Sequence, residues 1–293
     1  MGRRYDTVSF LSDFGLVDES VGVVKAVMRD MAPHALVIDL GHQVQAYDVR
    51  GGSLMLARCV SYLPSGVVMA VVDPGVGAAR RAVAIEVADG DGVMIGPDNG
   101  LLAPAVAMAG GAGRAVLLDN PEFHLLSPGG MFAARDIFAP VAAHLCNGVD
   151  LHDLGARIDP DELLPGVVPL PRDDDGSVYG EVLWIDHYGN CQLNMGPDDV
   201  AGWDTLVQVT AGDTVRVATL IGAAAGLDAV GPGAVALVVD AYGMLTLCLD
   251  HRSASSELAL APGDQVSIAP LAPEHASTVA PLVVTPVTLR PSR

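Results

Sequence analysis

The chain has 293 residues, of which 51% are hydrophobic and 4% aromatic, and its formal net charge is −19. A surface this negative repels phosphate backbones and anionic lipids, which argues against nucleic acid or a membrane as a partner. The four cysteines lie far apart without a C-x-x-C pair, so zinc motifs and disulfide scaffolds are excluded, and free thiols in a reducing, cytoplasmic compartment are favoured.

The first half of the chain alternates predicted strands and helices. Helical spacing predicts helices at 21–31, 49–63, 103–109 and 136–144, and apolar runs predict strands at 7–11, 36–40, 67–72, 83–87 and 92–95. This alternation is typical of a layered α/β domain with a mainly parallel sheet. We expect no transmembrane helix, because no apolar run reaches about 18 residues without interruption, and no signal peptide precedes residue 13.

The character of the sequence changes after about residue 165. Prolines and an Asp-rich run at 169–176 indicate a linker, and short predicted strands follow at 177–185, 206–210, 214–220, 235–239, 244–249 and 265–270. We therefore expect an N-terminal α/β domain over 1–168 and a smaller C-terminal all-β barrel over 177–293. No internal repeat is detected, and the Thr-, Val- and Pro-rich tail at 276–293 is expected to be partly disordered.

Polar residues follow several of the predicted strands. In α/β domains, ligands bind beyond the carboxyl ends of the strands. Taken singly, these residues are more often turn formers, helix caps or surface ion pairs, but together they predict a polar rim. The rim lacks a P-loop or a G-x-G-x-x-G motif, so it suits hydroxyls and cations better than a pyrophosphate. Its members are Asp13, Asp18, Asp73, Arg80, Arg81, Asp98, Asn99, Arg135 and Asp136.

A second distinctive string, WIDHYGN, lies in the predicted barrel at residues 184–190. Tyr188 could stack on a base while Asn190 pairs with the edge of that base. An ordinary hairpin turn ending in Gly189–Asn190 explains the string equally well.

Taken together, these strings resemble the S-adenosylmethionine (SAM) hydroxide adenosyltransferases, also called SAM hydrolases, which are related to the SAM-dependent fluorinase and chlorinase. The matching strings occur in the family's order: SDFGLVDESVGVVKAVM, DLGHQVQAYDV, VVDPGVGAARRAVAIEV, GPDNGLL, ARDIFAPVAAHL and IDHYGNCQLNM, with a looser match at DAYGMLTLCL. The resemblance implies hydrolysis of SAM to adenosine and methionine without a metal or further cofactor. It also implies a homotrimer with SAM bound between one subunit's α/β domain and a neighbour's barrel.

The resemblance also assigns roles to residues at matching positions. Asp73 and Arg80 would orient and activate the attacking water. The halogenases carry an uncharged residue at the position of Asp73, and a carboxylate there would repel halide, so the hydrolase branch is favoured. The remaining assignments concern the substrate: Asp13 for the ribose hydroxyls, Asp18 and Asp186 for the methionine amino group, Tyr47 and Phe132 for the walls of the ribose site, Tyr188 and Asn190 for adenine, with Asn99, Arg135 and Tyr242 completing the substrate-binding set.

The sequence departs from the family pattern at two places. Ala133 stands where the hydrolases have a histidine that acts with Asp73 and Arg80, and Ala241 stands where relatives tend to have serine. Three alternatives to active hydrolysis therefore stay open. They are a SAM- or adenosine-binding protein with little turnover, an adenosyl transferase using another nucleophile and, as the weakest because of Asp73, a halogenase.

Overall fold

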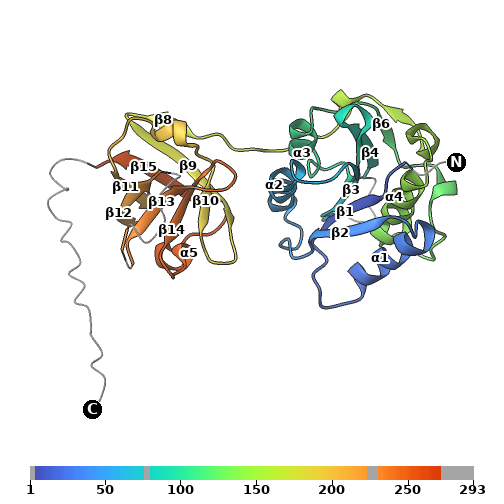
Figure 1. Cartoon of the computed structure of the whole chain (residues 1–293), viewed down its shortest axis with the longest axis horizontal. Helices are drawn as coiled ribbons and strands as arrows, with labels where there is room; N and C mark the ends of the chain where they lie inside the picture. Colours follow the sequence, from blue (N-terminus) through green and yellow to red (C-terminus); the bar gives the residue numbers. More distant parts are fainter. Residues whose placement is uncertain (1–3, 76–79, 223–229, 232, 272–293) are drawn as a thin grey trace, which may run out of the picture. The chain divides into compact units, whose positions relative to one another are not determined.

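The computed structural model describes residues 4–75, 80–222, 230–231 and 233–271. The chain divides into two compact units, Met1–Val168 and Pro169–Arg293, each of which is described separately below (Figure 1). The C-terminal tail at 276–293, expected to be partly disordered, lies outside the described residues. Among those residues, no helix combines the length and the apolar character needed to span a membrane.

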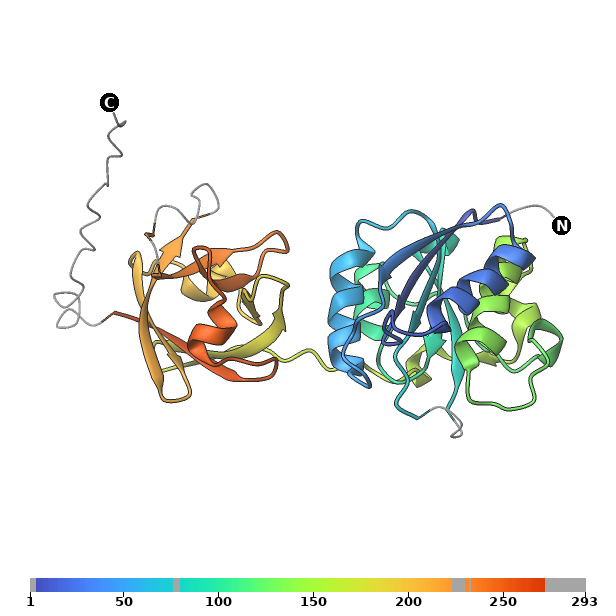
Figure 2. The ribbon, with the colours of Figure 1, turned by 90° about the horizontal axis from the view of Figure 1, so that it is seen from below.

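The first unit is built on a seven-stranded sheet in the order β2-β1-β3-β5-β4-β6-β7. Strands β2, β1, β3 and β5 are parallel, as predicted, whereas β4, β6 and β7 add an antiparallel edge. Helices α1 and α4 cover one face of the sheet and α2 and α3 the other (Figure 2). The elements are β1 (Thr7–Ser12), α1 (Ser20–Met31), β2 (Leu36–Gly41), α2 (Val49–Val60), β3 (Gly66–Val71), β4 (Ala82–Val87), β5 (Gly92–Pro97), α3 (Ala103–Met108), β6 (Ala115–Leu117), α4 (Ala139–Cys146) and β7 (Arg157–Ile158).

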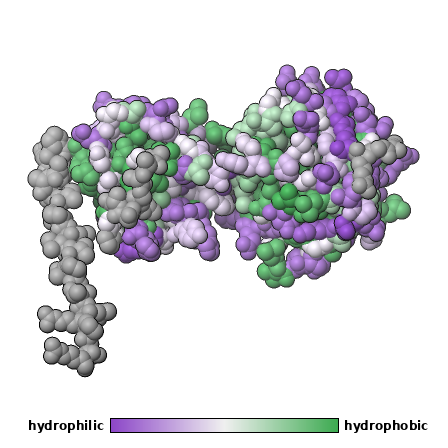
Figure 3. All heavy atoms as spheres, viewed as in Figure 1, coloured by the Kyte–Doolittle hydropathy of each residue, from purple (hydrophilic) through white to green (hydrophobic). Residues whose placement is uncertain are grey.

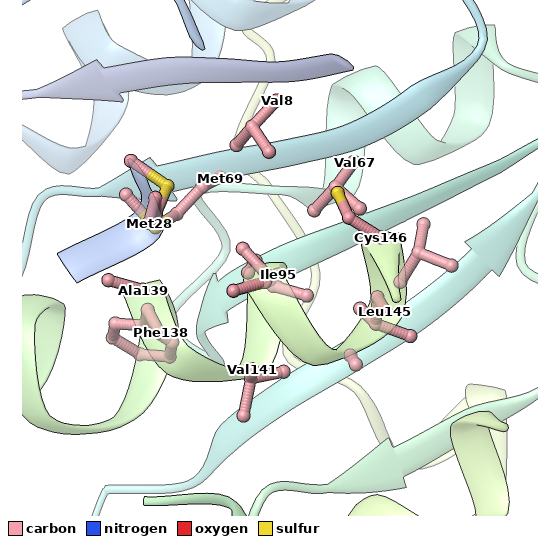
Figure 4. Packing of buried hydrophobic residues seen from close by; sticks show 14 of the residues in the cluster. Val8, Met28, Val67, Met69, Ile95, Phe138, Ala139, Val141, Leu145 and Cys146 are labelled. Carbon is pink, nitrogen blue, oxygen red and sulfur yellow. The ribbon is translucent and has the colours of Figure 1, made fainter. Parts of the chain in front are cut away.

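Strands β3 and β5 are apolar throughout because both faces of the sheet are covered. In β3, Val67 and Met69 belong to the core beneath α1 and α4, whereas Val68 and Ala70 belong to the core beneath α2 and α3. This division follows from the alternation of side chains along a strand. Figure 4 shows the first of these cores, in which Val8, Val67, Met69 and Ile95 of the sheet pack near Met28 and the side chains of α4.

The helix predicted at 136–144 differs from expectation at its start. The chain first forms a π-helical turn over Ala134–Phe138, in which the Ala139 N–H donates to the Ala134 carbonyl, and α4 follows. Pro140 has no N–H to donate, so the ordinary helical ladder cannot run unbroken through this point. π-Helical turns of this kind are frequent at functional sites.

The second unit is a closed barrel. Strands β10, β14, β13, β12, β11, β15 and β9 form a continuous ladder that returns to β10, and β8 pairs with the outer edge of β9. Part of the stretch predicted as linker, Arg172–Asp174, is therefore a strand of this unit. The elements are β8 (Arg172–Asp174), β9 (Ser177–Ile185), β10 (Cys191–Leu193), β11 (Leu206–Ala211), β12 (Thr214–Ile221), β13 (Val235–Val239), β14 (Leu245–Leu249), α5 (Ala254–Leu258) and β15 (Gln265–Pro270).

The barrel interior is filled by small and medium aliphatic side chains. In β11, Val207, Val209 and Ala211 point into the core, whereas Gln208 and Thr210 between them are only partly buried. All four cysteines are free thiols, as predicted, and burial raises the pKa of Cys146, Cys191 and Cys248 to about 12. These three thiols are therefore protonated and poorly reactive at neutral pH.

Candidate active site

The loops that follow the parallel strands carry the first group of site residues. Asp13 comes directly after β1, and its Oδ2 accepts a hydrogen bond of 2.9 Å from the Tyr47 N–H in the loop after β2. Tyr47 has a left-handed backbone (φ 69°) and an exposed ring. The hydrogen bond therefore joins two neighbouring strand ends and brings Asp13 and Tyr47 together.

Asp73 follows β3 and forms an ion pair with Arg80. Both side chains are largely buried, with 10% of the Asp73 side chain and 22% of the Arg80 side chain exposed. The Gly75 N–H also donates to Asp73 Oδ1, at 3.2 Å. The ion pair with Arg80 and the hydrogen bond from Gly75 thus hold the carboxylate in place.

A cavity of about 240 Å³ lies between these loops and the start of the π-helical turn. It is smaller than the ~300–1,000 Å³ of a typical ligand pocket, so it would hold only part of a large ligand. Arg80 and Asn99 instead line a wider, more open hollow of about 730 Å³ next to Pro74 and Asp98. The Asp73–Arg80 ion pair connects the smaller cavity, which Asp73 lines, with the wider hollow, which Arg80 lines. Residues lining the smaller cavity include Asp13, Phe14, Tyr47, Asp73, Phe132 and Ala133.

Aromatic contacts shape the far wall of the cavity. The Phe132 ring meets Phe14 edge-on with centroids 5.8 Å apart, and the Arg135 guanidinium lies 5.3 Å from the Phe132 ring centre. Arg135 is held by Asp136, with Nε 2.6 Å from Oδ1 and Nη2 3.0 Å from Oδ2. Arg135 therefore supports Phe132 and does not line the cavity itself.

Two residues predicted to bind substrate have clear structural roles. Asp18 accepts the Ser20 N–H at 2.9 Å at the start of α1, and this hydrogen bond lowers the pKa of the exposed carboxyl. The Asn99 side chain donates to the Val72 carbonyl at 2.9 Å and accepts the Leu101 N–H at 3.1 Å, which ties the end of β3 to the turn after β5. The cavity formed by Asp13 and Asp73 includes neither residue.

The WIDHYGN string forms the hairpin between β9 and β10. Asp186 Oδ1 accepts the N–H groups of Tyr188 and Asn190, both at 2.9 Å, and Asp186 Oδ2 accepts the Asn190 side-chain amide at 2.8 Å. Gly189 has φ +84°, and a Cβ there would lie 2.1 Å from Ser253 Oγ. Most of the Tyr188 ring is exposed. The carboxylate of Asp186 thus builds the turn that presents Tyr188.

The hairpin between β13 and β14 repeats this turn, although no repeat was detected in the sequence. Asp240 Oδ1 accepts the N–H groups of Tyr242 and Met244 at 2.8 and 3.0 Å, and Gly243 has φ +78°. Asp240 Oδ2 also accepts from Gln192 Nε2 and Thr246 Oγ1. Asp240 was missed as a candidate residue, although the shared pattern D-x-Y-G at 186–189 and 240–243 could have revealed it.

Two further features bear on the chemistry of the site. Ala133 and Ala134 line the cavity near Asp73, so the place of the family histidine is occupied by methyl groups. His124 is not among the residues that line this cavity, and burial lowers its pKa. Among the described residues, no group of three or more His, Cys, Asp or Glu side chains is arranged to hold a metal ion.

The fold and the site define a two-domain protein in which an α/β unit carries an acidic, aromatic-walled pocket and a β-barrel presents exposed tyrosines. The chain belongs to the SAM hydroxide adenosyltransferase family, because the models for that family's N-terminal and C-terminal domains match residues 8–155 and 180–267.

Several characterised or solved proteins are similar to this chain. A protein of Salinispora tropica named (R)-S-adenosyl-L-methionine hydrolase is 40% identical over 261 residues, covering 89% of this chain and 97% of the relative. A protein of the same name from Thermus thermophilus is 38% identical over 89% of this chain and 98% of its own length. A fluorinase of Nocardia brasiliensis is 29% identical over 71% of this chain and 78% of its own.

Among solved structures, an uncharacterized conserved protein from Thermotoga maritima matches with a TM-score of 0.81 and 32% sequence identity. The match covers 89% of this chain and 99% of that one. The two-domain architecture predicted from the sequence, an α/β domain followed by a β-barrel, is confirmed by this match.

Proposed function

We propose that this protein hydrolyses SAM to adenosine and L-methionine. The observation that carries the proposal is the Asp73 carboxylate, which lines the acidic cavity and is paired with Arg80. Family membership and the relatives named (R)-S-adenosyl-L-methionine hydrolase support the same reaction. Asp73 also argues against the halogenase reaction, because a carboxylate in the cavity repels halide.

In the proposed reaction, a water molecule attacks C5′ of the ribose in line with the sulfonium. The new O–C5′ bond forms as the C5′–S bond breaks, and the electron pair of the broken bond neutralises sulfur, giving the thioether of methionine. Asp73 accepts the proton of the water and later returns it to solvent. Arg80 holds the carboxylate in position. Because the leaving group is already cationic, the step needs no metal or further cofactor, and positioning supplies much of the rate.

The geometry of each unit supports a set of proposed substrate contacts. Asp13 would accept the ribose hydroxyls, with Tyr47 and Phe132 as walls, because all three line the cavity. Tyr188 and Asn190 would take adenine. Tyr242 is a second exposed aromatic, in the hairpin at the other end of β14. Asp186 Oδ2 accepts the Asn190 amide, and because a carboxylate oxygen has two lone pairs it retains acceptor capacity for the methionine ammonium. Asp18 is exposed, so it could contact the methionine ammonium only at the protein surface.

Incubation of the purified protein with SAM in ¹⁸O-labelled water tests the reaction. We expect adenosine carrying ¹⁸O at C5′ together with unlabelled methionine, resolved by chromatography and mass spectrometry. Both sulfonium epimers are supplied separately, because the names of the relatives specify the R form. Adenine or methylthioadenosine as the product, or no product at all, would contradict the proposal.

A second candidate function is a SAM- or adenosine-binding protein with little turnover. Ala133 favours it, because alanine cannot hydrogen-bond the attacking water as the family histidine would. A hydrogen bond to a charged partner contributes roughly 1.5–3 kcal/mol, or about 10–150-fold in rate. We therefore propose slow but measurable hydrolysis. Tight adenosine binding without release of product would favour the binding protein, and products formed only with added thiols or halides would indicate another nucleophile.

We also propose that the active assembly is a homotrimer whose sites lie between subunits. The cavity in the α/β unit is small, and Tyr47 and Met131, which line it, are exposed. Leu16 and Val17 are also exposed, in the loop after β1 that carries Asp13 and Phe14. Figure 3 shows hydrophobic residues exposed among hydrophilic ones on the viewed face of each unit. Exposed apolar side chains clustered around a pocket are typical of an interaction surface.

Mixing two variants that are each impaired, assayed below saturating SAM, tests the shared site. Asp73→Asn disables only the α/β unit and Tyr188→Ala only the barrel, so mixed trimers would regain part of the activity after subunit exchange. Additive activity with no gain would contradict sites shared between subunits, and native mass spectrometry reports the number of subunits directly. A cytoplasmic location is proposed on the ground that the four cysteines are free thiols.

A further inference from the structure

We propose that His42 is a positioning residue that fixes the direction of the Asp13 carboxylate and so determines how tightly the ribose hydroxyls are held. The proposal rests on the proposed function, since it assigns Asp13 to the ribose. Asp39 acts on His42 in turn, by holding its imidazole in one tautomer. None of these roles requires His42 or Asp39 to touch the substrate.

A chain of four side chains runs from the surface to the loop after β1. Lys25, the only lysine in the sequence, places Nζ 2.8 Å from Asp39 Oδ2. Asp39 Oδ1 lies 3.2 Å from His42 Nε2, and His42 Nδ1 lies 2.8 Å from Ser12 Oγ. Asp39 is 44% exposed at its side chain, whereas His42 and Ser12 are buried. The chain therefore leads from solvent to the residue immediately before Asp13.

The charges along this chain select a tautomer of His42. A carboxylate beside Nε2 favours the proton on that nitrogen, which leaves Nδ1 with a lone pair. The Ser12 hydroxyl then donates its hydrogen to Nδ1, and its oxygen faces the Phe14 N–H at 3.5 Å. Burial raises the pKa of Asp39, whereas the Lys25 hydrogen bond and the nearby His42 imidazole lower it. The net effect holds this pKa below its usual value, so Asp39 is a carboxylate at neutral pH.

His42 holds the Asp13 loop on both sides of the carboxylate. Its ring binds Ser12, one residue before Asp13, and its backbone carbonyl accepts the Gly15 N–H at 2.6 Å, two residues after Asp13. The Asp13 carboxylate itself is then oriented by the Tyr47 N–H, which follows His42 in the same loop. Loss of the imidazole nitrogens would release the first of these three restraints and loosen the turn that aims Asp13.

The ring of His42 also packs within the aromatic series that reaches the cavity. Its centroid lies 4.6 Å from that of Phe10, and Phe10 meets Phe14 edge-on at 6.3 Å. A substitution that removed the ring would therefore disturb packing as well as hydrogen bonding. His42→Phe keeps an aromatic ring in this position and removes both nitrogens, which makes it the informative variant.

Ligand selectivity separates positioning from simple destabilisation. Binding of adenosine and of 2′,3′-dideoxyadenosine is measured by calorimetry for the wild type, His42→Phe, Asp13→Ala and the double variant. We expect His42→Phe to weaken adenosine binding about tenfold, the scale of one lost hydrogen bond, and to change binding of the dideoxy compound by less than about threefold. In the Asp13→Ala background, His42→Phe should have no further effect. His124→Phe, the same change at a histidine outside the cavity, should alter neither ligand.

Equal weakening of both ligands, or a full His42→Phe effect in the Asp13→Ala background, would overturn the proposal. Should His42→Phe fail to fold, Asp39→Asn at its partly exposed position serves instead. We expect this variant to lose less affinity for adenosine than His42→Phe, and again to lose more for adenosine than for the dideoxy compound. The ¹⁵N spectrum of histidine-labelled protein tests the tautomer without any ligand, and a proton on Nδ1 would overturn it. Failure of the proposed function appears separately, as a wild type that releases no adenosine from SAM.

Discussion

Replacement of Asp73 by asparagine is the most direct test of the proposed chemistry. Asparagine has nearly the same shape and can still accept the Gly75 N–H, which binds Asp73 Oδ1 at 3.2 Å. It cannot take a proton from water, and it leaves the largely buried Arg80 without its anionic partner. The variant therefore removes the base and the charge while changing the space in the cavity very little.

Two magnitudes follow from this environment. Loss of a general base typically costs ~100- to 10,000-fold in rate, so we expect kcat to fall by about 100-fold or more. Removing one partner of a fully buried ion pair costs about 3–5 kcal/mol of stability. Because Arg80 remains 22% exposed and can recruit water, a loss of about 1–3 kcal/mol is expected instead.

The assay is adenosine release at saturating SAM. Loss of the Asp73 charge can also weaken binding of the cationic sulfonium, and saturation keeps that effect out of the measured kcat. Thermal unfolding of the same samples gives the change in stability. Asp98→Asn is the matched control, because Asp98 is also buried and paired with an arginine, Arg81, yet does not line the cavity of Asp73. Unchanged turnover in Asp73→Asn, or an equal loss in both variants, would refute a specific role of Asp73 as base.

Four further predictions follow. Tyr188→Ala should weaken adenosine binding by roughly 1–3 kcal/mol, the value of base stacking on an aromatic, while the melting temperature stays unchanged because the ring is exposed; wild-type affinity by calorimetry would place adenine elsewhere. Ala133→His combined with Ala134→Gly should raise the rate of adenosine formation about 10-fold or more, and no gain from an already fast wild type would show that the histidine is dispensable here. Gly189→Ala should destabilise the barrel, because φ is +84° and the Cβ would meet Ser253, and a melting temperature equal to that of the wild type would contradict this. Hydrogen bonds from Arg114 hold the pKa of Glu86 below its usual value, against the opposing effect of burial. The ionised Glu86 therefore stabilises the fold fully above its unfolded pKa of about 4.3, and this contribution is lost as the pH falls through the lower folded pKa. Glu86→Gln should make the free energy of unfolding, measured by denaturant titration, less dependent on pH in this acid range.

The long elements of the fold could be predicted from the sequence because their periodicity extends over enough residues. The strands β6, β7, β8 and β10 were missed because two or three residues carry no readable alternation. The π-helical turn before α4 was hidden as well, since its cause, Pro140, lies inside a stretch with ordinary helical spacing. The antiparallel pairing of β4 with β6 was hidden because β5 and α3 separate these two strands in the sequence.

The site could be predicted only in part, for a similar reason. Turn chemistry at strand ends identified Asp13 and Asp73, which the structure brings to one cavity. It could not show that both the oxygen and the nitrogen of the Asn99 amide hydrogen-bond to the backbone, or that Asp18 accepts the first N–H of α1. His42 was overlooked because its partner Ser12 lies 30 residues away in the chain, and only the pairing of β1 with β2 brings them together.

In the two similar hairpins of the barrel, the residues that form the turn are different from those that could determine ligand specificity. In both loops aspartate, tyrosine and glycine build the turn, whereas the second and fifth positions differ: His187 and Asn190 in one, Ala241 and Met244 in the other. Substitutions at these variable positions leave the backbone hydrogen bonds of the turn in place. Ligand preference could therefore drift during evolution without loss of a stable barrel, and each five-residue loop is a transplantable unit for engineering.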